Sequence, residues 1–217
     1  MKSEKVFITG CDHTNEWMMP WFVENYKKHN TTPLIFADFG VSDLNKIKSL
    51  HNFYALMNAQ SNDEGKGWFK KPKVMCSSPS EKTVWLDTDC QVLTNIEDIF
   101  DLLEPNKLNM VEDKPWTARR GTNGPWYNSG VVGFIGQPMI LKNWAEWVKN
   151  TTESGDQEVL YAKLDMMQKL TYINPLPNEY NWLRLQLEND NQDSWNKKII
   201  HWTGHKGKLK IKEMMNV

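Results

Sequence analysis

The chain has 217 residues, a length that suits one domain, spanning residues 1–217, with a substantial hydrophobic core. Its formal net charge of −1 argues against a nucleic-acid partner or an anionic membrane partner, since both need a strongly basic surface. Cys11, Cys76 and Cys90 have neither disulfide nor metal-site spacing, which favours a reducing compartment. No apolar segment is long enough for a signal peptide or a transmembrane segment, so we expect a cytoplasmic protein.

Short apolar runs alternate with helical patterns in the first third of the chain. Strands are predicted at residues 6–10, 34–38 and 52–57, and helices from Asn15, from Ser42 as the capping residue, and over residues 68–74. Residues 63–67 form a polar loop in this prediction. Alternating strands and helices indicate an α/β fold, with a mainly parallel mixed sheet flanked by helices. In such sheets ligands bind beyond the carboxyl ends of the strands.

The central feature of the sequence is an apolar run at residues 83–86 that leads into Asp87-Thr88-Asp89. The run is typical of a buried strand, and the backbone leaves the sheet where such a strand ends. There Asp87 and Asp89 can point to the same side and share one hard divalent cation. The alternative is that both carboxylates face water in a turn. The apolar residues on both sides make a solvated turn less favourable, and both interpretations stay open at this point.

The second half of the chain continues the alternation with less regularity. Helices are predicted at residues 96–103, at 138–149, and from Gly155-Asp156-Gln157 onward, where Leu160, Leu164 and Met167 would share one face; strands are predicted at 108–111, 127–136, 172–175 and 198–202. Residues 116–126 form a long irregular loop in this prediction, and residues 203–208 form a basic, glycine-containing loop that could lie against a diphosphate. Asp156 also has an ordinary explanation, as a residue that matches the dipole of its helix.

Four features occur together in a fixed order: Asp87-Thr88-Asp89, then Asn128-Ser129-Gly130, then Gly155-Asp156-Gln157, and finally His201 followed by Gly204 and lysines. In this order the sequence resembles the GT-A-fold nucleotide-sugar glycosyltransferases. The similarity is greatest to glycosyltransferase family 8, which includes glycogenin and lipopolysaccharide galactosyltransferases. It extends over residues 6–208, nearly the whole chain.

The resemblance implies a role for each matching residue. Asp87, Asp89 and His201 would hold Mn²⁺ or Mg²⁺, and Asp156 and Gln157 would lie close to the anomeric carbon as the catalytic pair. The implied donor-binding residues are Thr9, Gly10 and Asp12 at the base, Lys71 and Thr88 near the metal pair, Asn128, Ser129 and Gly130 at the donor sugar, and Gly204, Lys206 and Lys208 at the diphosphate. The family places its phosphate-binding lysine six residues after the histidine, where this chain has Gly207. Lys206 and Lys208 therefore both remain candidates.

The resemblance also implies the reaction. We expect a metal-dependent hexosyltransferase that moves a sugar from a nucleotide-diphosphate donor, a UDP-sugar, to a hydroxyl of a glycan or another acceptor, with retention of configuration. A bacterial or viral cytoplasmic enzyme fits the lack of an anchor. Two other interpretations stay open: a non-catalytic module that binds nucleotide sugars, and a phosphatase of the haloacid-dehalogenase type. The phosphatase pattern requires Thr or Val two residues after the second aspartate, where this chain has Gln91.

Overall fold

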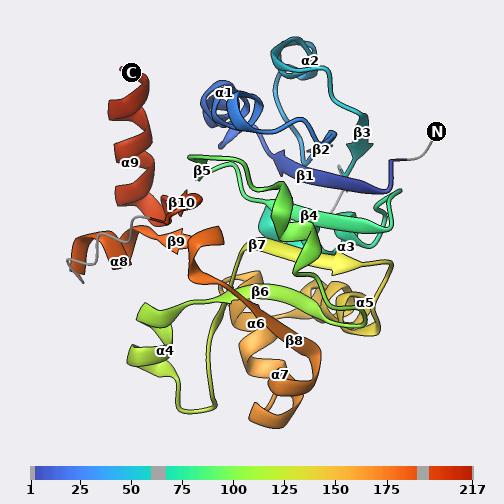
Figure 1. The fold of residues 1–217 in the computed structure, drawn as a ribbon, viewed down its shortest axis with the longest axis vertical. Coiled ribbons are helices and arrows are strands. Elements are labelled where there is room, and N and C mark those ends of the chain that lie inside the picture. Colours follow the sequence, from blue (N-terminus) through green and yellow to red (C-terminus); the bar gives the residue numbers. More distant parts are fainter. Residues whose placement is uncertain (1–2, 60–66, 190–195, 217) are drawn as a thin grey trace.

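The computed structural model describes residues 3–59, 67–189 and 196–216. Seven strands form the large sheet, in the spatial order β3-β2-β1-β4-β7-β6-β8 (Figure 1). They are β1 (Lys5–Cys11), β2 (Leu34–Asp38), β3 (Ala55–Asn58), β4 (Lys82–Leu86), β6 (Leu108–Glu112), β7 (Tyr127–Ile135) and β8 (Ile173–Leu176). The pairs β1–β2, β1–β4, β2–β3 and β6–β8 are parallel, whereas β7 runs antiparallel to β4 and β6. The predicted mixed, mainly parallel sheet is confirmed.

Helices cover both faces of this sheet. The helices of the described residues are α1 (Met19–His29), α2 (Leu44–Leu50), α3 (Gly67–Met75), α4 (Lys114–Arg120), α5 (Met139–Trp147), α6 (Asp156–Lys163), α7 (Met166–Tyr172), α8 (Arg184–Asn189) and α9 (Gly204–Met215), with 3-10 turns at Glu16–Met18, Glu97–Asp101, Val148–Asn150 and Asn178–Tyr180. Side chains alternate across each strand, so Phe7 packs with α1 on one face while Ile8 packs with α5 on the other. The sheet therefore lies between two separate hydrophobic cores.

A second, smaller sheet was not predicted. Its strands are β5 (Cys90–Val92), β10 (Ile199–His201) and β9 (Trp182–Leu183), and it lies beside α8 and α9 (Figure 1). In β5 and β10 the antiparallel register sets Cys90 opposite His201. This pairing joins the segment that follows the Asp-x-Asp to the end of the chain, and so brings two distant parts of the sequence together.

The sequence misplaced one helix start and missed one helix. Asp43, not Ser42, caps α2: its Oδ1 accepts from the backbone N–H of Lys46 at 3.0 Å. The backbone N–H of Ser42 instead donates to Glu16 Oε2 at 2.7 Å. Within residues 116–126, the predicted irregular loop, the first half belongs to α4, which Asp113 caps through the N–H of Trp116 at 3.0 Å.

Three other expectations also differ from the structure. The helix that starts at Asp156 ends at Lys163, and Asp165 begins α7 with a capping box, so Leu160, Leu164 and Met167 do not share one helical face. The basic segment 203–208 is not a loop, since α9 begins at Gly204. Residues 96–103 contain a 3-10 helix at Glu97–Asp101 instead of an α-helix. Most of the predicted polar loop at residues 63–67 lies outside the described residues.

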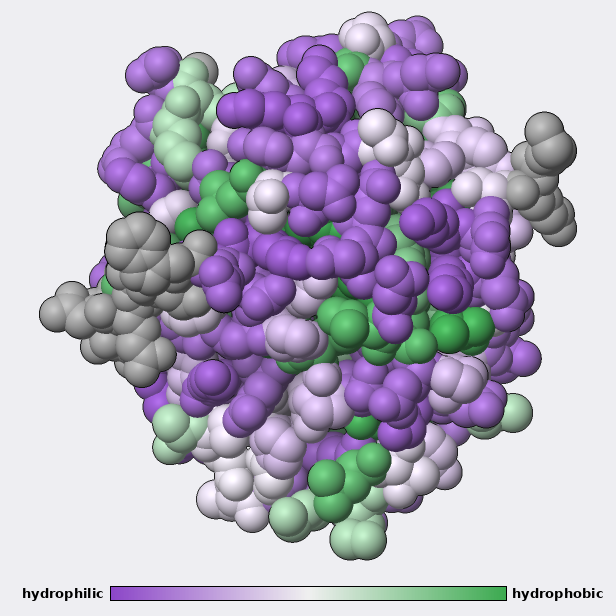
Figure 2. All heavy atoms as spheres, in the orientation of Figure 1, coloured by the Kyte–Doolittle hydropathy of each residue, from purple (hydrophilic) through white to green (hydrophobic). Residues whose placement is uncertain are grey.

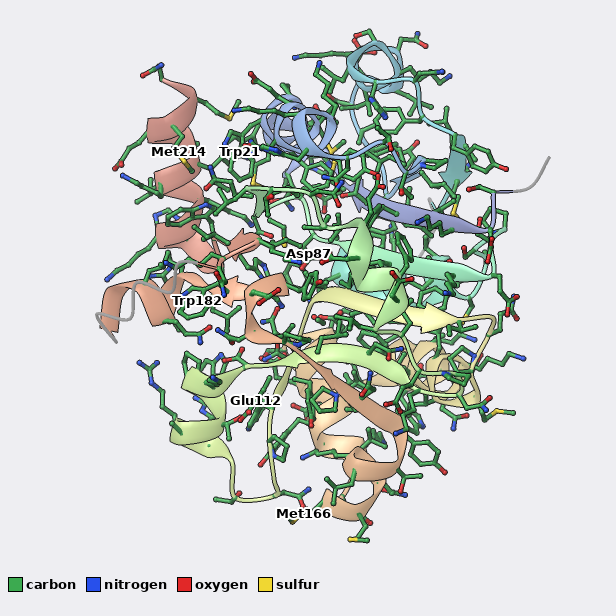
Figure 3. All side chains as sticks on the ribbon, in the orientation of Figure 1. Trp21, Asp87, Glu112, Met166, Trp182 and Met214 are labelled. Carbon is green, nitrogen blue, oxygen red and sulfur yellow. The ribbon has the colours of Figure 1, made fainter. Side chains whose placement is uncertain are left out.

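The surface shown in Figure 2 is mainly hydrophilic, with hydrophobic residues in separate groups. One group lies over α7, where 55% of Met166, labelled in Figure 3, is exposed. No helix in the described part of the chain combines the length and the apolar character that crossing a bilayer requires.

Candidate active site at the carboxyl edge of the sheet

The predicted metal ligands come together at the end of β4. Asp87 and Asp89 follow this strand directly, and Figure 3 labels Asp87 near the centre of the view. The Nε2 atom of His201 lies 3.1 Å from Asp89 Oδ1 and 3.9 Å from Asp87 Oδ2. One ligand atom from each of the three residues lies within 4.8 Å of the other two. Two carboxylate oxygens and one imidazole nitrogen suit Mn²⁺ well and Mg²⁺ acceptably, so these residues fit a divalent cation.

The charges of these ligands stabilise one another. Burial alone would lower the pKa of His201, but the charge and hydrogen bond of Asp89 outweigh it, and the pKa is raised. Burial would correspondingly raise the pKa of Asp89, but His201 outweighs that effect, and the pKa is lowered. A site that keeps Asp89 ionised in this way is prepared for a cation.

The imidazole ring of His201 occupies the space that a side chain at position 130 would fill, and Gly130 has no side chain. A Cβ atom built on Gly130 would lie 2.1 Å from Cε1 and 2.4 Å from Nδ1 of His201. The strand pairing explains this position, because the register between β6 and β7 shifts between Met110 and Val111, whose partners are Val132 and Asn128. Such a bulge locally turns a strand and its side chains. At residues 128–130 it aims the start of β7 at the metal ligands.

Lys71 is a buried cation between two carboxylates. Only 2% of its side chain is exposed, and its Nζ lies 2.9 Å from Asp156 Oδ2 and 3.3 Å from Asp87 Oδ1. The same atom donates to the carbonyl oxygen of Ser129 at 2.8 Å. Burial would lower the pKa of Lys71, but the charges of Asp156 and Asp87 outweigh it and raise the pKa above its ordinary value. Lys71 therefore neutralises the carboxylates that surround it.

Asp156 is the first residue of α6 and follows the N-cap residue Gly155. The Oδ1 atom accepts from the hydroxyl of Ser129 at 3.1 Å, while Oδ2 meets Lys71. Burial raises the pKa of Asp156, and the charge of Lys71 opposes that rise only in part. The interpretation of Asp156 as a simple helix-start residue does not explain these contacts, all of which lie in the site.

Gln157 and Asn128 belong to a second polar cluster, centred on Asp113. The Oδ2 atom of Asp113 accepts from Gln157 Nε2 at 3.1 Å and from Asn128 Nδ2 at 3.3 Å. Asn128 Nδ2 also donates to Gln157 Oε1 at 3.0 Å. Asp113 is 2% exposed, and burial raises its pKa. The side-chain amide of Gln157 is therefore held in one orientation.

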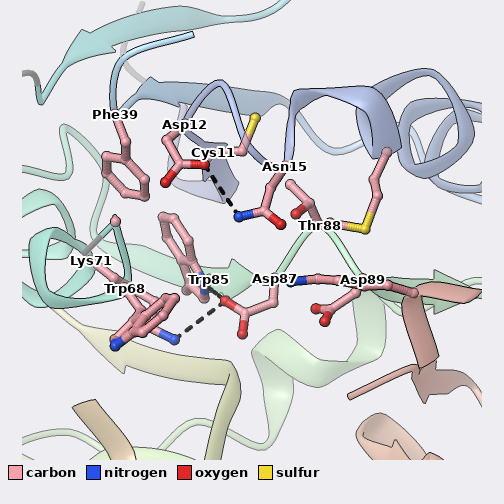
Figure 4. Close-up of a pocket in the computed structure, with 14 residues that line it drawn as sticks. Cys11, Asp12, Asn15, Phe39, Trp68, Lys71, Trp85, Asp87, Thr88 and Asp89 are labelled. Carbon is pink, nitrogen blue, oxygen red and sulfur yellow. Dashed lines mark hydrogen bonds and ion pairs between the residues drawn. The ribbon is translucent and has the colours of Figure 1, made fainter. Parts of the chain in front are cut away.

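Two cavities meet at these residues. The first lies under the carboxyl ends of β1 and β4, and Figure 4 shows Asp12, Asn15, Phe39, Trp68, Trp85 and Asp87 around it. The second, of about 330 Å³, is lined by Asp156, Gln157, His201 and Trp116 among others. Trp68, Lys71 and Asp87 line both, so the Lys71–Asp87 pair stands at the junction.

Some of the remaining predicted donor-binding residues line the two cavities, and others do not. Gly10, Asp12, Thr88 and Lys208 line the first cavity, as do Lys71, Asp87 and Asp89, whereas Asn128 and Ser129 line the second. Thr9 is fully buried in β1 and lines neither cavity in the described structure. Lys206 is exposed and is likewise absent from both linings, and Gly204 begins α9 with a φ of +71°. Of the two candidate lysines, the geometry favours Lys208.

Several site residues were missed in the sequence. Asp113 follows a predicted strand, as Asp87 does, and that position was its only signal. Trp85 belongs to β4, and its Nε1 donates to Asp87 Oδ1 at 2.6 Å. Trp68 lines both cavities. Asn181, which contacts His201, had no signal at all, since it lies in an irregular segment with no motif around it.

No protein-family profile matches the chain, and no curated protein matches it significantly in sequence. Solved structures do match it. The galactosyltransferase LgtC, solved in complex with donor and acceptor sugar analogues, aligns with a TM-score of 0.67 at 13% identity, over 97% of this chain and 95% of that chain. A glycosyltransferase involved in glycosylation of the major capsid of PBCV-1 aligns with a TM-score of 0.61 at 15% identity, over 99% of this chain and 100% of that chain.

The glycosyltransferase GlyE of Streptococcus pneumoniae TIGR4 also aligns, with a TM-score of 0.66 at 16% identity over 94% of this chain, which corresponds to 55% of that chain. Identities this low establish shared architecture, not shared substrates. The narrower resemblance to family 8 stays a prediction. Strand order, site position and these alignments agree on one conclusion: the chain has the GT-A glycosyltransferase fold.

Proposed function

We propose that this protein transfers a sugar from a nucleotide-diphosphate donor, a UDP-sugar, to a hydroxyl group of a glycan or other acceptor, with a divalent metal ion and with retention of configuration. The observation that carries the proposal is the convergence of Asp87, Asp89 and His201 beside the buried Lys71–Asp156 pair. This arrangement lies at the carboxyl edge of a GT-A sheet, where α/β folds bind their ligands.

Asp87, Asp89 and His201 would hold Mn²⁺ or Mg²⁺. When bound there, the cation supplies Lewis-acid charge that stabilises the departing nucleoside diphosphate. The nucleotide would occupy the first cavity, with Asp12 and Gly10 toward the base and Lys208 toward the diphosphate. Lys208 would add one charge-assisted hydrogen bond to a phosphate oxygen.

The donor sugar would lie in the second cavity beside Asp156 and Gln157. The Asp156 carboxylate stabilises positive charge that develops at the anomeric carbon, an interaction stronger in the transition state than in the ground state. Lys71 and Ser129 fix both oxygens of that carboxylate. Asp113 and Asn128 hold the amide of Gln157 in place. The leaving phosphate would assist in deprotonating the acceptor on the same face of the sugar.

We further propose that the reaction takes place in a bacterial cytoplasm or in a virus-infected host cytoplasm. The three cysteines of the protein, Cys11, Cys76 and Cys90, are all free in the structure, which is consistent with a reducing compartment.

The deciding experiment measures release of nucleoside diphosphate from a panel of nucleotide sugars, with Mn²⁺ or with excess chelator, and with or without candidate acceptors. We expect release to need the metal, and Asp89→Ala to abolish it in a folded protein. Binding of a nucleotide sugar without any release would identify a non-catalytic module instead. Full turnover in chelator would overturn the metal assignment.

Retention has its own test, an NMR spectrum of the first product formed from an α-linked donor. We expect an α-linked product. A β-linked product would assign the chain to an inverting mechanism while leaving the metal assignment intact.

A further inference from the structure

The imidazole of His201 is held from behind by two amide oxygens. Its Nδ1 lies 3.0 Å from Asn128 Oδ1 and 3.1 Å from Asn181 Oδ1. His201 is 5% exposed and Asn181 is completely buried. Burying an amide is costly unless its polar atoms are paired, so Asn181 has a structural or functional reason to occupy this position.

The hydrogen bonds around Asn128 fix which of its amide atoms faces the imidazole. The backbone N–H of Gly130 can only donate, and it donates to Asn128 Oδ1 at 2.9 Å. The Nδ2 atom of Asn181 donates to the same oxygen at 2.8 Å, which leaves Asn181 Oδ1 toward His201. Both neighbours of Nδ1 are therefore acceptors, and Nδ1 must carry the proton.

A proton on Nδ1 determines what Nε2 can do. Nε2 is the atom that faces Asp89 and Asp87. Without a cation, the hydrogen bond to Asp89 Oδ1 holds any second proton of the imidazole on Nε2, and once a cation displaces that proton Nε2 presents its lone pair to the metal. A nitrogen with a free lone pair can bind a metal ion, whereas a protonated one cannot. Partners of this kind behind a metal-binding histidine fix its tautomer and its orientation.

We propose that Asn181 is a positioning residue for the metal centre, which accepts the Nδ1 proton of His201 and orients Asn128 to do the same. The inference rests on the metal site of the proposed function. Asn181 can hold this position because it immediately precedes β9, which pairs in parallel with β10, so that the backbone beside His201 fixes the backbone of Asn181. A single buried side chain thus supplies two hydrogen bonds that keep Nε2 available.

The test measures Mn²⁺ binding to the metal-free full chain by the loss of the free-ion EPR signal. Asn181→Ala removes the acceptor, and we expect it to weaken Mn²⁺ binding about 10–100-fold. Asn181→Asp keeps an acceptor for the Nδ1 proton but loses the donor to Asn128 Oδ1, so we expect it to bind Mn²⁺ more weakly than the parent and more tightly than Asn181→Ala.

The matched control is Asn109→Ala. Asn109 is equally buried at 0% exposure and equally hydrogen-bonded, to Glu104, Gly133 and Asn174, but it contacts none of the metal ligands. It should lower stability without changing Mn²⁺ affinity. Asn181→Ala binding like the parent would overturn the inference, and so would Asn181→Asp binding as weakly as Asn181→Ala.

A second measurement needs no variant. In ¹⁵N spectra of the metal-free parent, we expect a proton on Nδ1, whether or not Nε2 also carries one. The opposite tautomer would overturn the inference even if Asn181→Ala did not fold. Failure of the parent to bind Mn²⁺ would instead refute the metal site itself, so the two failures are distinguishable.

Discussion

Replacing Lys71 by methionine removes one buried charge and keeps the length of the side chain. In the parent, the Nζ atom lies 2.9 Å from Asp156 Oδ2 and 3.3 Å from Asp87 Oδ1. Asp156 is 5% exposed, so without Lys71 its carboxylate would be buried beside Asp87 with no compensating charge. Such a site is unstable because the remaining charges repel one another and have lost contact with water.

The expected loss follows from the geometry. Coulomb's law with an effective dielectric constant of about 20 gives roughly 6 kcal/mol for opposite charges 2.9 Å apart. Part of this is offset because Lys71 itself no longer has to be desolvated. Removing one partner of a buried ion pair costs about 3–5 kcal/mol, and we expect Lys71→Met to lower the free energy of unfolding by that amount at pH 7.

The assay is urea unfolding of metal-free parent and variant at pH 7 and pH 5. Burial raises the pKa of Asp156 in the parent, and loss of Lys71 raises it further. Stability associated with a raised pKa is present at low pH and lost as the pH rises through the folded-state pKa. The deficit of the variant should therefore be smaller at pH 5 than at pH 7, and Asp156→Asn in the same chain should recover part of it. A deficit below about 1 kcal/mol, or one independent of pH, would refute the reasoning.

Three further outcomes follow from the site. Gly130→Ala should abolish Mn²⁺ binding, measured by EPR, because its Cβ would lie 2.1 Å from Cε1 of His201; undiminished binding would mean that the ring can move. Lys208→Ala should weaken UDP binding several-fold in a thermal-shift titration with Mn²⁺, whereas the exposed Lys206→Ala should not, and the reverse order would reassign the phosphate contact. Asp156→Asn should reduce kcat far more than it changes donor affinity; equal losses in both would make it a ground-state binding residue.

The order of strands and helices could be read from the sequence because most β-strands of the large sheet contain a short apolar run with polar or glycine-containing flanks. The run at residues 34–38 matches β2 in full. β10 lies within the predicted strand at residues 198–202, but the smaller sheet could not be predicted, since β9 has two residues and β5 has three, too few for a periodic pattern. These strands form because their partners are present, and the partners are distant in sequence.

Charged residues of the site were predictable, while the residues that hold them were not. Asp87, Asp89 and His201 have recognisable spacing, and the structure brings them together. Asn181 and Asp113 act through buried hydrogen bonds; nothing in its local sequence distinguishes Asn181 from other asparagines, and Asp113 has only its position after a predicted strand. Lys71 was expected near the donor, yet its charge is already matched by two carboxylates, a pairing that exists only in three dimensions.

Because β5 pairs antiparallel with β10, the position of His201 in the metal centre depends on the register between these two strands. Successive side chains of a strand point to opposite faces, so a slip of one residue would keep the ladder but turn His201 away from the carboxylates. Val92 and Ile199 pair with each other and are both buried in the core. Their burial fixes the register in which Cys90 lies opposite His201. A one-residue deletion inside β10 would therefore abolish metal binding without removing any ligand, and two apolar residues that bind nothing are as necessary to the site as the carboxylates.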